Sequence, residues 1–332
     1  MSDLLPLTFA SAPYDRFLSL LHTETRPSGI ALRFLPIDHP RDVFDRFITT
    51  SDFDLAELST SEYITLHVSG DRRFIALPVF PSRAFRHSFI AVNSDRLKSP
   101  KDLEGKRIGV QHYTMTAAVW QRGILAHDYG VDLSGVTWVE GKMEGPGSHG
   151  KPGSLPPPVG VQIEKNTDTG RSLSDLLRDG DVDATIGADP PACLGQGSVR
   201  RLWPEFKKEE KAFYKRTGIF PIMHLVAIRR EVWERNTWIA TSLFEAFEKS
   251  KDLARKRMES TSALRYMLPW LPEALDDIKE TFGGDCWPYG IEPNRKTLEA
   301  LVLYLYEQGL IDKMVALEDL FAPIKPANFP VQ

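Results

Sequence analysis

Short apolar runs and segments of helical periodicity alternate through the first ninety residues, and this alternation constrains the fold more than any other feature. Apolar runs that predict strands occupy residues 7–11, 31–37, 54–58 and 74–80. Helical patterns occupy 14–25 and 40–48, with Pro40 near a first turn, and a third helix opens in STSEYITLHV. Strands and helices in alternation predict a parallel sheet with helices packed on its faces.

A second series of elements follows. Strands are predicted at 88–93, 107–110, 136–140, 182–188 and 224–232, helices at 114–128 and 172–180, an irregular Gly- and Pro-rich segment at 141–160, and mostly helix from 233 to about 315. The pattern predicts two α/β lobes. Lobe 1 would comprise 1–92 plus 226–332 and lobe 2 would comprise 93–225, so the chain would cross twice. Ligands bind at the carboxyl ends of strands in such sheets, which predicts a cleft between the lobes.

Composition removes several classes of protein. The formal net charge of -4, with both signs mixed along the chain, lacks the basic field of a nucleic-acid binder. Cys193 and Cys286 lie too far apart for a metal motif or a disulfide framework. No apolar run approaches the ~20 residues that span a bilayer. The N-terminus lacks the pattern of a signal peptide, so we expect a soluble, cytoplasmic protein that does not bind a membrane.

Two arginines and a histidine stand between two apparent core strands in PVFPSRAFRHSFIAVN (78–93). Surface arginines are the ordinary interpretation of a loop of this kind. Here Arg83, Arg86 and His87 fall within five residues at a strand end, and guanidinium forks bind carboxylates through two hydrogen bonds. We therefore predict an anion site at Arg83 and Arg86.

Other strand ends are also polar. Ser59 and Glu62 fit a capping box, and Ser61 lies between them. That cap is compatible with a site, because a helix N-terminus attracts anions.

After the strand at 107–110 come Tyr113, Thr114 and Thr116, of which either threonine could cap the next helix and form a second anion site. Arg122 on that helix is undecided between packing and binding.

Two further residues end or begin strands. Asp189, held by Pro190 and Pro191, is equally consistent with a turn and with a site. His224 opens the second crossing, and its place at the presumed hinge favours a functional role over a structural one. His87, His112, His224 and Asp189 could converge on a metal, but their spacing gives that alternative no support. Nucleotide-binding, zinc-protease and serine-hydrolase motifs are absent from the sequence.

Four stretches resemble one family of enzymes, the 4,5-dihydroxyphthalate decarboxylases. They are LPVFPSRAFRHSFIAVN, LEGKRIGVQHYTMTAAVWQRGILAHDYGV, LLRDGDVDATIGADPP and YKRTGIFPIMHLVAIRREV. The resemblance extends from about residue 5 to 325 and implies a type 2 periplasmic-binding-protein-like fold. It also implies a lyase of aromatic compound metabolism, active in phthalate degradation, that removes CO2 from a catechol dicarboxylate to give protocatechuate.

That chemistry fits the polar residues already identified. Protonation of the ring carbon before CO2 leaves requires a general acid, and His224 is our first assignment, with His87 as its partner and the reverse order open. Asp189 or Tyr113 would hold the hydroxyls. The carboxylates of the substrate would be bound by the remaining predicted site residues, which are Ser59, Ser61, Arg83, Arg86, Thr116 and Arg122. No organic cofactor is needed, while a divalent metal on the catechol oxygens and a homo-oligomer stay open.

Two other functions fit the same fold. A non-catalytic protein that binds a small anion would use the same cleft and arginines, but the missing export signal disfavours a transport receptor. The pyrimidine-synthesising branch of the fold lacks support, because the lysine and glycine-rich phosphate pattern is absent. A related aromatic or tropolone diacid would also suit the site.

Overall fold

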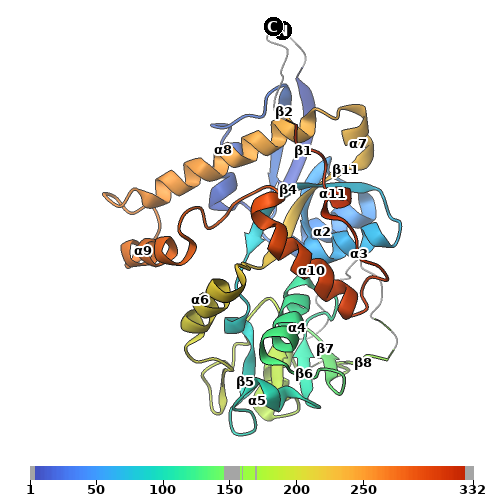
Figure 1. Cartoon of the computed structure of the whole chain (residues 1–332), viewed down its shortest axis with the longest axis vertical. Coiled ribbons are helices and arrows are strands. Elements are labelled where there is room, and N and C mark those ends of the chain that lie inside the picture. Colours follow the sequence, from blue (N-terminus) through green and yellow to red (C-terminus); the bar gives the residue numbers. More distant parts are fainter. Residues whose placement is uncertain (1–3, 146–157, 159, 169, 326–332) are drawn as a thin grey trace.

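The computed structural model describes residues 4–145, 158, 160–168 and 170–325, and it shows two α/β lobes (Figure 1). Each lobe is built on its own sheet. The predicted irregular segment at 141–160 lies largely outside the described residues. In the part of the chain that is described, no helix combines the length and apolarity needed to cross a bilayer.

The sheet of lobe 1 has the strand order β2-β1-β3-β11-β4. Its strands are β1 (Leu5–Ser11), β2 (Ile30–Pro36), β3 (Leu55–Ser59), β4 (Phe74–Arg83) and β11 (Ile222–Arg229). β1 runs parallel to β2 and β3, whereas β11 runs antiparallel to both β3 and β4. The sheet is therefore mixed and not purely parallel as predicted, because β11 returns from the other lobe and enters from the opposite end.

The sheet of lobe 2 has the order β10-β5-β9-β6-β7-β8. Its strands are β5 (Ala91–Asn93), β6 (Arg107–Val110), β7 (Thr137–Glu140), β8 (Gln162–Lys165), β9 (Ala184–Ile186) and β10 (Val199–Arg201). The central strands are parallel, and β5 is antiparallel to β9 and β10. The chain thus changes sheet between β4 and β5 and again between β10 and β11, close to the two predicted crossings.

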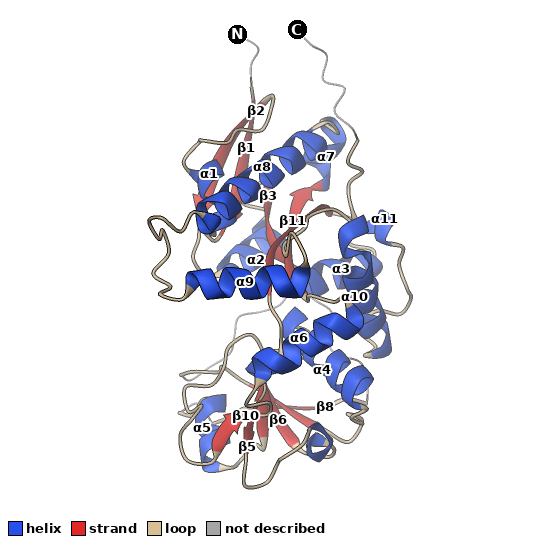
Figure 2. Cartoon of the chain, turned by 60° about the vertical axis from the view of Figure 1, so that its left-hand side comes forward, coloured by secondary structure: helices blue, strands red, loops and turns tan. Residues whose placement is uncertain are grey.

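Helices cover both sheets and join the lobes (Figure 2). They are α1 (Leu18–Leu21), α2 (Pro40–Thr50), α3 (Thr60–Val68), α4 (Thr116–Tyr129), α5 (Leu173–Asp179), α6 (Phe206–Thr217), α7 (Arg230–Arg235), α8 (Ile239–Glu259), α9 (Leu271–Phe282), α10 (Arg295–Glu307) and α11 (Leu317–Leu320). α10 contacts α3 of lobe 1 and α4 of lobe 2. Gly123 permits this approach, since a Cβ there would lie 2.0 Å from the Tyr304 ring.

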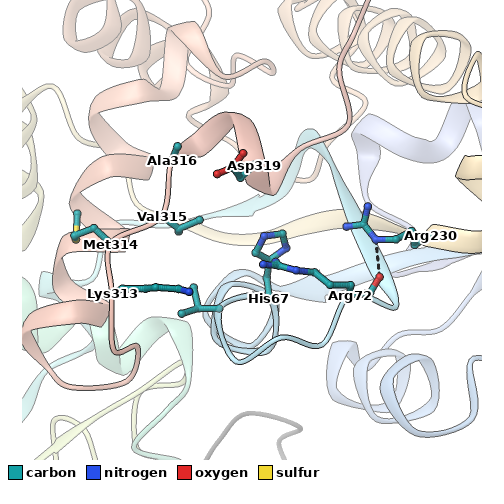
Figure 3. Close-up of a pocket in the computed structure, with 9 residues that line it drawn as sticks. His67, Arg72, Arg230, Lys313, Met314, Val315, Ala316 and Asp319 are labelled. Atoms are coloured by element: carbon teal, nitrogen blue, oxygen red, sulfur yellow. Dashed lines mark hydrogen bonds between the residues drawn. The ribbon is translucent and has the colours of Figure 1, made fainter.

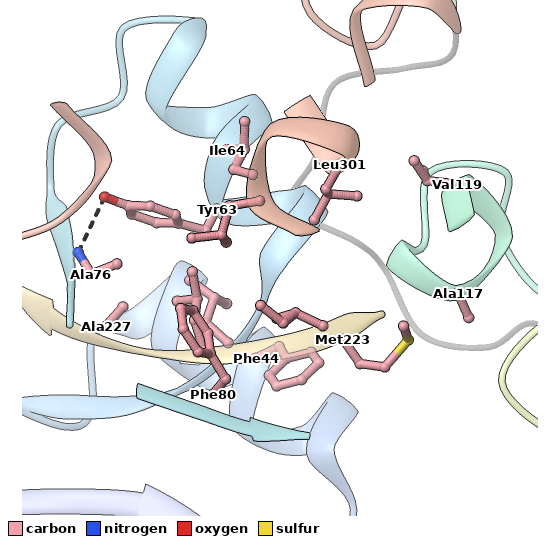
Figure 4. Packing of buried hydrophobic residues seen from close by; sticks show 14 of the residues in the cluster. Phe44, Tyr63, Ile64, Ala76, Phe80, Ala117, Val119, Met223, Ala227 and Leu301 are labelled. Atoms are coloured by element: carbon pink, nitrogen blue, oxygen red, sulfur yellow. Dashed lines mark hydrogen bonds between the residues drawn. The ribbon is translucent and has the colours of Figure 1, made fainter. Parts of the chain in front are cut away.

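The apolar core is continuous across the contact between the lobes (Figure 4). Phe44 and Phe80 of lobe 1 belong to the same buried cluster as Val119 of α4. Tyr63 is buried in this cluster, and its hydroxyl accepts a hydrogen bond from the Ala76 backbone N–H at 3.1 Å. The two lobes therefore pack against each other through this cluster, while a second, smaller buried cluster lies within lobe 2, around Leu173 and Leu177.

Two predicted helix caps are wrong in detail. Ser59 does precede α3, but its side chain makes no capping bond, and Glu62 pairs with Arg41 instead of reaching back. Met115 precedes α4, so neither Thr114 nor Thr116 is its cap residue. The hydroxyls of Ser59 and Thr116 bond to each other across the lobes, at 3.0 Å.

Candidate active site

A cavity of about 460 Å³ opens at the strand ends where the two lobes meet. β3 ends beside it at Ser59, Gln111 directly follows the end of β6, and Met223 and His224 lie near the start of β11. The carboxyl ends of strands at a change of sheet are where ligands bind in α/β proteins. The residues that line the cavity are His39, Pro40, Arg41, Phe44, Ser59, Glu62, Arg86, Gln111, His112, Met115, Thr116, Ala117, Lys142, Met143, Glu144, Ala188, Asp189, Met223 and His224.

Arg86 brings a buried positive charge to the cavity wall. Its side chain donates to the Met223 sulfur at 3.0 Å and to the Ala188 carbonyl at 3.3 Å, and it lies over the Phe89 ring. Within the described residues, no carboxylate comes into ion-pair contact with it. Burial lowers the pKa of Arg86 to about 10, against the opposing influence of Asp189 and Glu210, so the group stays charged at neutral pH. A buried cation that has no carboxylate in direct contact can bind an anion.

His224 lines the cavity and is bonded from behind by a carboxylate. Its Nδ1 lies 2.6 Å from Glu57 Oε1, and its ring meets the Phe44 ring edge-on at 4.9 Å. Both residues lie on neighbouring strands, because β11 pairs with β3. The His224 side chain keeps 20% of its surface exposed, whereas that of Glu57 has none. A histidine oriented by a buried carboxylate and open to a cavity can transfer a proton.

Hydroxyls from both lobes gather where α3 and α4 begin. Thr116 Oγ1 accepts from the Ser61 backbone N–H at 3.0 Å and lies 2.9 Å from Ser61 Oγ. Ser59 and Thr116 line the cavity, whereas Ser61 lies behind them. Two helix N-termini that face the cavity add partial positive charge beside Arg86.

Asp189 faces the cavity from lobe 2 and is held by a side-chain amide. Gln111 Nε2 donates to Asp189 Oδ2 at 3.0 Å, and Gln111 Oε1 accepts from the Ala188 N–H at 3.0 Å. Gly187 makes this arrangement possible, since its φ is +151° and a Cβ there would lie 2.6 Å from Gln111 Oε1. Asp189 is therefore fixed as a hydrogen-bond acceptor at the cavity wall.

Arg83 and Arg86 separate in the structure. Arg83 ends β4 and donates to the carbonyls of Phe220, at 3.0 Å, and Pro288, at 3.4 Å. Its guanidinium stacks on the Phe220 ring, and it does not line the cavity. Its position does not support the predicted role in carboxylate binding.

His87 is also away from the cavity. Only 1% of its surface is exposed, and the rings of Tyr129, Trp203 and Phe213 surround it. Neither ring nitrogen has a hydrogen-bond partner among the described residues, and burial with the nearby charge of Arg216 lowers its pKa to about 4. This environment suits a neutral packed ring better than a proton donor.

Tyr113 and Arg122 border a different cavity, of about 550 Å³, beside α4 and α10. Arg122 stacks on the Tyr113 ring at 3.7 Å and donates to the Tyr113 carbonyl and to Gln308. The predicted contacts of these two residues with a ligand in the main cavity therefore find no support in their positions.

A further cavity of about 540 Å³ lies on lobe 1 alone (Figure 3). His67 stands at its centre, near Arg72 and Arg230, and Arg230 donates to the Arg72 carbonyl at 2.6 Å. Burial and these two arginines lower the pKa of His67 to about 4. None of the predicted site residues borders this cavity.

Several residues of the main cavity escaped the sequence analysis. Among the described residues no cluster of His, Cys, Asp and Glu fits a metal ion. At the cavity wall the unforeseen residues are Gln111 beside Asp189, Arg41, which pairs with Glu62, and His39, Lys142 and Glu144; behind the wall, Glu57 contacts His224. Glu57 carried a detectable signal, since a carboxylate inside the apolar strand DLAEL needs a buried partner.

Comparison with known proteins agrees with this architecture. No family model matches the chain. It is 37% identical to a 4,5-dihydroxyphthalate decarboxylase from Comamonas testosteroni over 330 residues, 98% of this chain and 99% of the relative. It is 41% identical to a 4,5-dihydroxyphthalate decarboxylase from Pseudomonas putida over 194 residues, 58% of this chain and 74% of the relative.

Solved structures show the same fold. A periplasmic aliphatic sulphonate-binding protein from Escherichia coli has a TM-score of 0.54 at 16% identity, covering 99% of this chain and 96% of its own. A protein from Candida albicans, described as having the generic periplasmic-binding-protein fold, has a TM-score of 0.51 at 14% identity, with coverage of 99% and 100%. The predicted fold class is therefore confirmed.

Proposed function

Since the chain belongs to the 4,5-dihydroxyphthalate decarboxylase family, we propose that it is a carboxy-lyase that converts 4,5-dihydroxyphthalate to protocatechuate and CO2. The observation that carries the proposal is the pairing, in one cavity, of the buried Arg86 cation with a histidine backed by a buried carboxylate. The first feature suits a carboxylate substrate and the second suits proton transfer.

Substrate binding requires positive charge on the side of the two carboxylates. Arg86 supplies a full charge, and the N-termini of α3 and α4 supply partial charges from both lobes. Asp189, positioned by Gln111, accepts a hydrogen bond from a ring hydroxyl. The substrate would thus be held by its acidic edge and by its phenolic edge.

The reaction proceeds by protonation before the carbon–carbon bond breaks. Direct loss of CO2 from the ring would leave an unstable aryl carbanion. His224 delivers a proton to the ring carbon that bears the departing carboxylate, and the hydroxyl para to that carbon stabilises the cationic ring. The electrons of the carbon–carboxylate bond then return to the ring as CO2 leaves. The substrate's own hydroxyl is the electron source, so this route uses no organic cofactor.

The test is incubation of the pure protein with 4,5-dihydroxyphthalate in D2O. We expect CO2 and protocatechuate carrying deuterium at the carbon that lost CO2. His224→Gln should reduce turnover by roughly 10²–10⁴ with ligand affinity within a few-fold, the usual effect of removing a positioned acid. His87→Gln is the matched control and should retain turnover, because His87 lies outside the cavity.

Two outcomes would overturn parts of this proposal. If the protein binds the diacid but releases no CO2, with or without added divalent metal, a binding function replaces catalysis. If a related aromatic or tropolone diacid is turned over faster, the reaction class stands and the substrate changes. Cytoplasmic location and a homo-oligomer remain predictions.

A further inference from the structure

Glu57 does not line the cavity. Among the described residues, its side chain bonds to β1 and the loop after it, and also to the cavity histidine. Its carboxylate accepts hydrogen bonds from Ser11 Oγ at 2.7 Å, Tyr14 Oη at 2.8 Å and the Ala12 N–H at 3.3 Å. His224 Nδ1, at 2.6 Å, is the fourth contact. Each of the two oxygens of this fully buried group therefore has two hydrogen-bond contacts.

These contacts define the charge of the group. Burial by itself would raise the pKa of Glu57, but the hydrogen bond and charge of His224, with the bonds from Ser11 and Tyr14, hold the pKa below its usual value. Burial and the adjacent Glu57 raise the pKa of Tyr14, so its hydroxyl stays protonated and donates. The ionised carboxylate then requires a proton on Nδ1 of His224, which leaves Nε2 as the ring nitrogen available to the cavity.

We propose that Glu57 is a positioning residue of the decarboxylation: it fixes the orientation of His224 and stabilises the imidazolium that protonates the ring carbon. The inference rests on the proposed function. The Nε2 proton passes to the carbon bearing the carboxylate, CO2 leaves with the ring recovering its electrons, and His224 remains neutral with its proton on Nδ1. Water then restores the Nε2 proton.

A second carboxylate shows what a purely structural role looks like. Asp54, three residues earlier, accepts from the Thr8 N–H and Oγ1, both at 2.8 Å, and from Arg229 at 3.1 Å. Asp54 links the same three strands, β1, β3 and β11, as Glu57 does, but near the opposite end of β3, away from the cavity. Asp54 is thus a matched control for loss of a carboxylate that links strands.

Other titratable groups share the surroundings of His224. Tyr14 reaches it through Glu57, and Phe44 of α2 is its uncharged neighbour. The charged or titratable groups around the rest of the cavity are His39 and Arg41 at α2, Glu62 of α3, Arg86 after β4, and His112, Lys142, Glu144 and Asp189 of lobe 2. Glu57→Gln, Glu57→Asp and Asp54→Asn leave all of these groups unchanged, so a difference between these variants isolates Glu57.

The test compares Glu57→Gln with Asp54→Asn. In Glu57→Gln the limb of the pH–rate profile that requires protonated His224 should move to lower pH by about 1–3 units, the usual effect of a close opposite charge. At a pH above the limb, kcat of Glu57→Gln should be lower than that of the wild type by about tenfold for each pH unit by which the limb has moved. KM should stay within a few-fold of the wild-type value. Asp54→Asn should keep the wild-type profile. Glu57→Asp, which retains the charge, should move the limb back toward the wild-type position.

A readout without turnover separates this inference from the proposed function. The imidazole NMR signals of His224 in the substrate-free protein should show the same downward shift in Glu57→Gln, whether or not the diacid is decarboxylated. Tyr14→Phe removes one donor from Glu57 and concentrates its charge, so it should move the His224 titration upward. An unchanged His224 titration in Glu57→Gln overturns the inference. If that variant does not fold, a Tyr14→Phe titration that stays in place or moves downward overturns it instead.

Discussion

Replacement of Arg86 by Met should weaken substrate binding without weakening the fold. The wild-type guanidinium is buried, and its hydrogen bonds go to a sulfur and a carbonyl. Its pKa of about 10, against an ordinary 12.5, measures the cost of holding the charge there. A shift of this size corresponds to about 3 kcal/mol at neutral pH. The cost is full below the folded pKa and declines as the pH rises from the folded pKa towards the unfolded one.

The two consequences have opposite signs. In the absence of ligand, the free energy of unfolding of Arg86→Met should equal that of the wild type or exceed it by up to about 3 kcal/mol. Its urea midpoint should therefore be the same or higher. In its presence, loss of hydrogen bonds between a guanidinium and a carboxylate should cost about 1.5–3 kcal/mol, which is roughly 10- to 150-fold in affinity. Urea unfolding and titration calorimetry with the diacid measure these two quantities.

Arg83→Met is the matched control. Arg83 is also buried, and burial also lowers its pKa to about 10, but it lies outside the cavity. We expect its affinity for the diacid to stay within a few-fold of the wild type. The reasoning is refuted if Arg86→Met binds as tightly as the wild type, or if Arg83→Met loses as much affinity as Arg86→Met.

Two more predictions follow from buried and close-packed groups. Burial lowers the pKa of His87 from an ordinary 6.5 to about 4. As the pH drops from 6.5 to 4, this histidine binds a proton in the unfolded chain but not in the folded one, so the free energy of unfolding falls. The contribution of His87 to this loss of stability is about 2 kcal/mol between pH 7 and pH 5. His87→Phe should lack this contribution when urea unfolding is measured at the two pH values. If wild type and variant lose the same stability between pH 7 and pH 5, the prediction is contradicted. Gly187→Ala should displace Gln111 and with it Asp189, lowering kcat/KM by roughly 10²-fold, as a misplacement of about 1 Å can; unchanged kinetics would show that Asp189 has no part in the reaction.

The strand and helix pattern was sufficient to predict the fold class, because each element's apolar face is encoded locally. The runs at 54–58 and 74–80 are strands, Pro40 begins α2, and the chain changes sheets near the predicted crossings. The polar strand ends also led to Arg86, Asp189, Ser59, Thr116 and His224, which all line one cavity. The carboxyl ends of strands meet at one edge of each sheet, so this convergence follows from topology.

Side-chain direction within the short segment 83–87 could not be predicted in the same way. Arg83 still belongs to β4, and its guanidinium packs on Phe220 of the second crossing, whereas Arg86 follows the turn and reaches the cavity. His87 enters a short 3-10 turn (His87–Phe89) and is enclosed by rings from α4 and from 203 and 213. Three polar residues in one stretch therefore have three environments, each set by partners more than 40 residues away.

By itself, the sequence determined the two lobes, the family and the set of polar strand ends, because these depend on local patterns and on contiguous motifs. Tertiary structure alone decided which polar groups act together. Glu57 and His224 are 167 residues apart and meet only because β11 inserts beside β3. Pairing between distant strands is set by the packing of the whole sheet, so the proton-transfer pair could be identified only from the assembled fold.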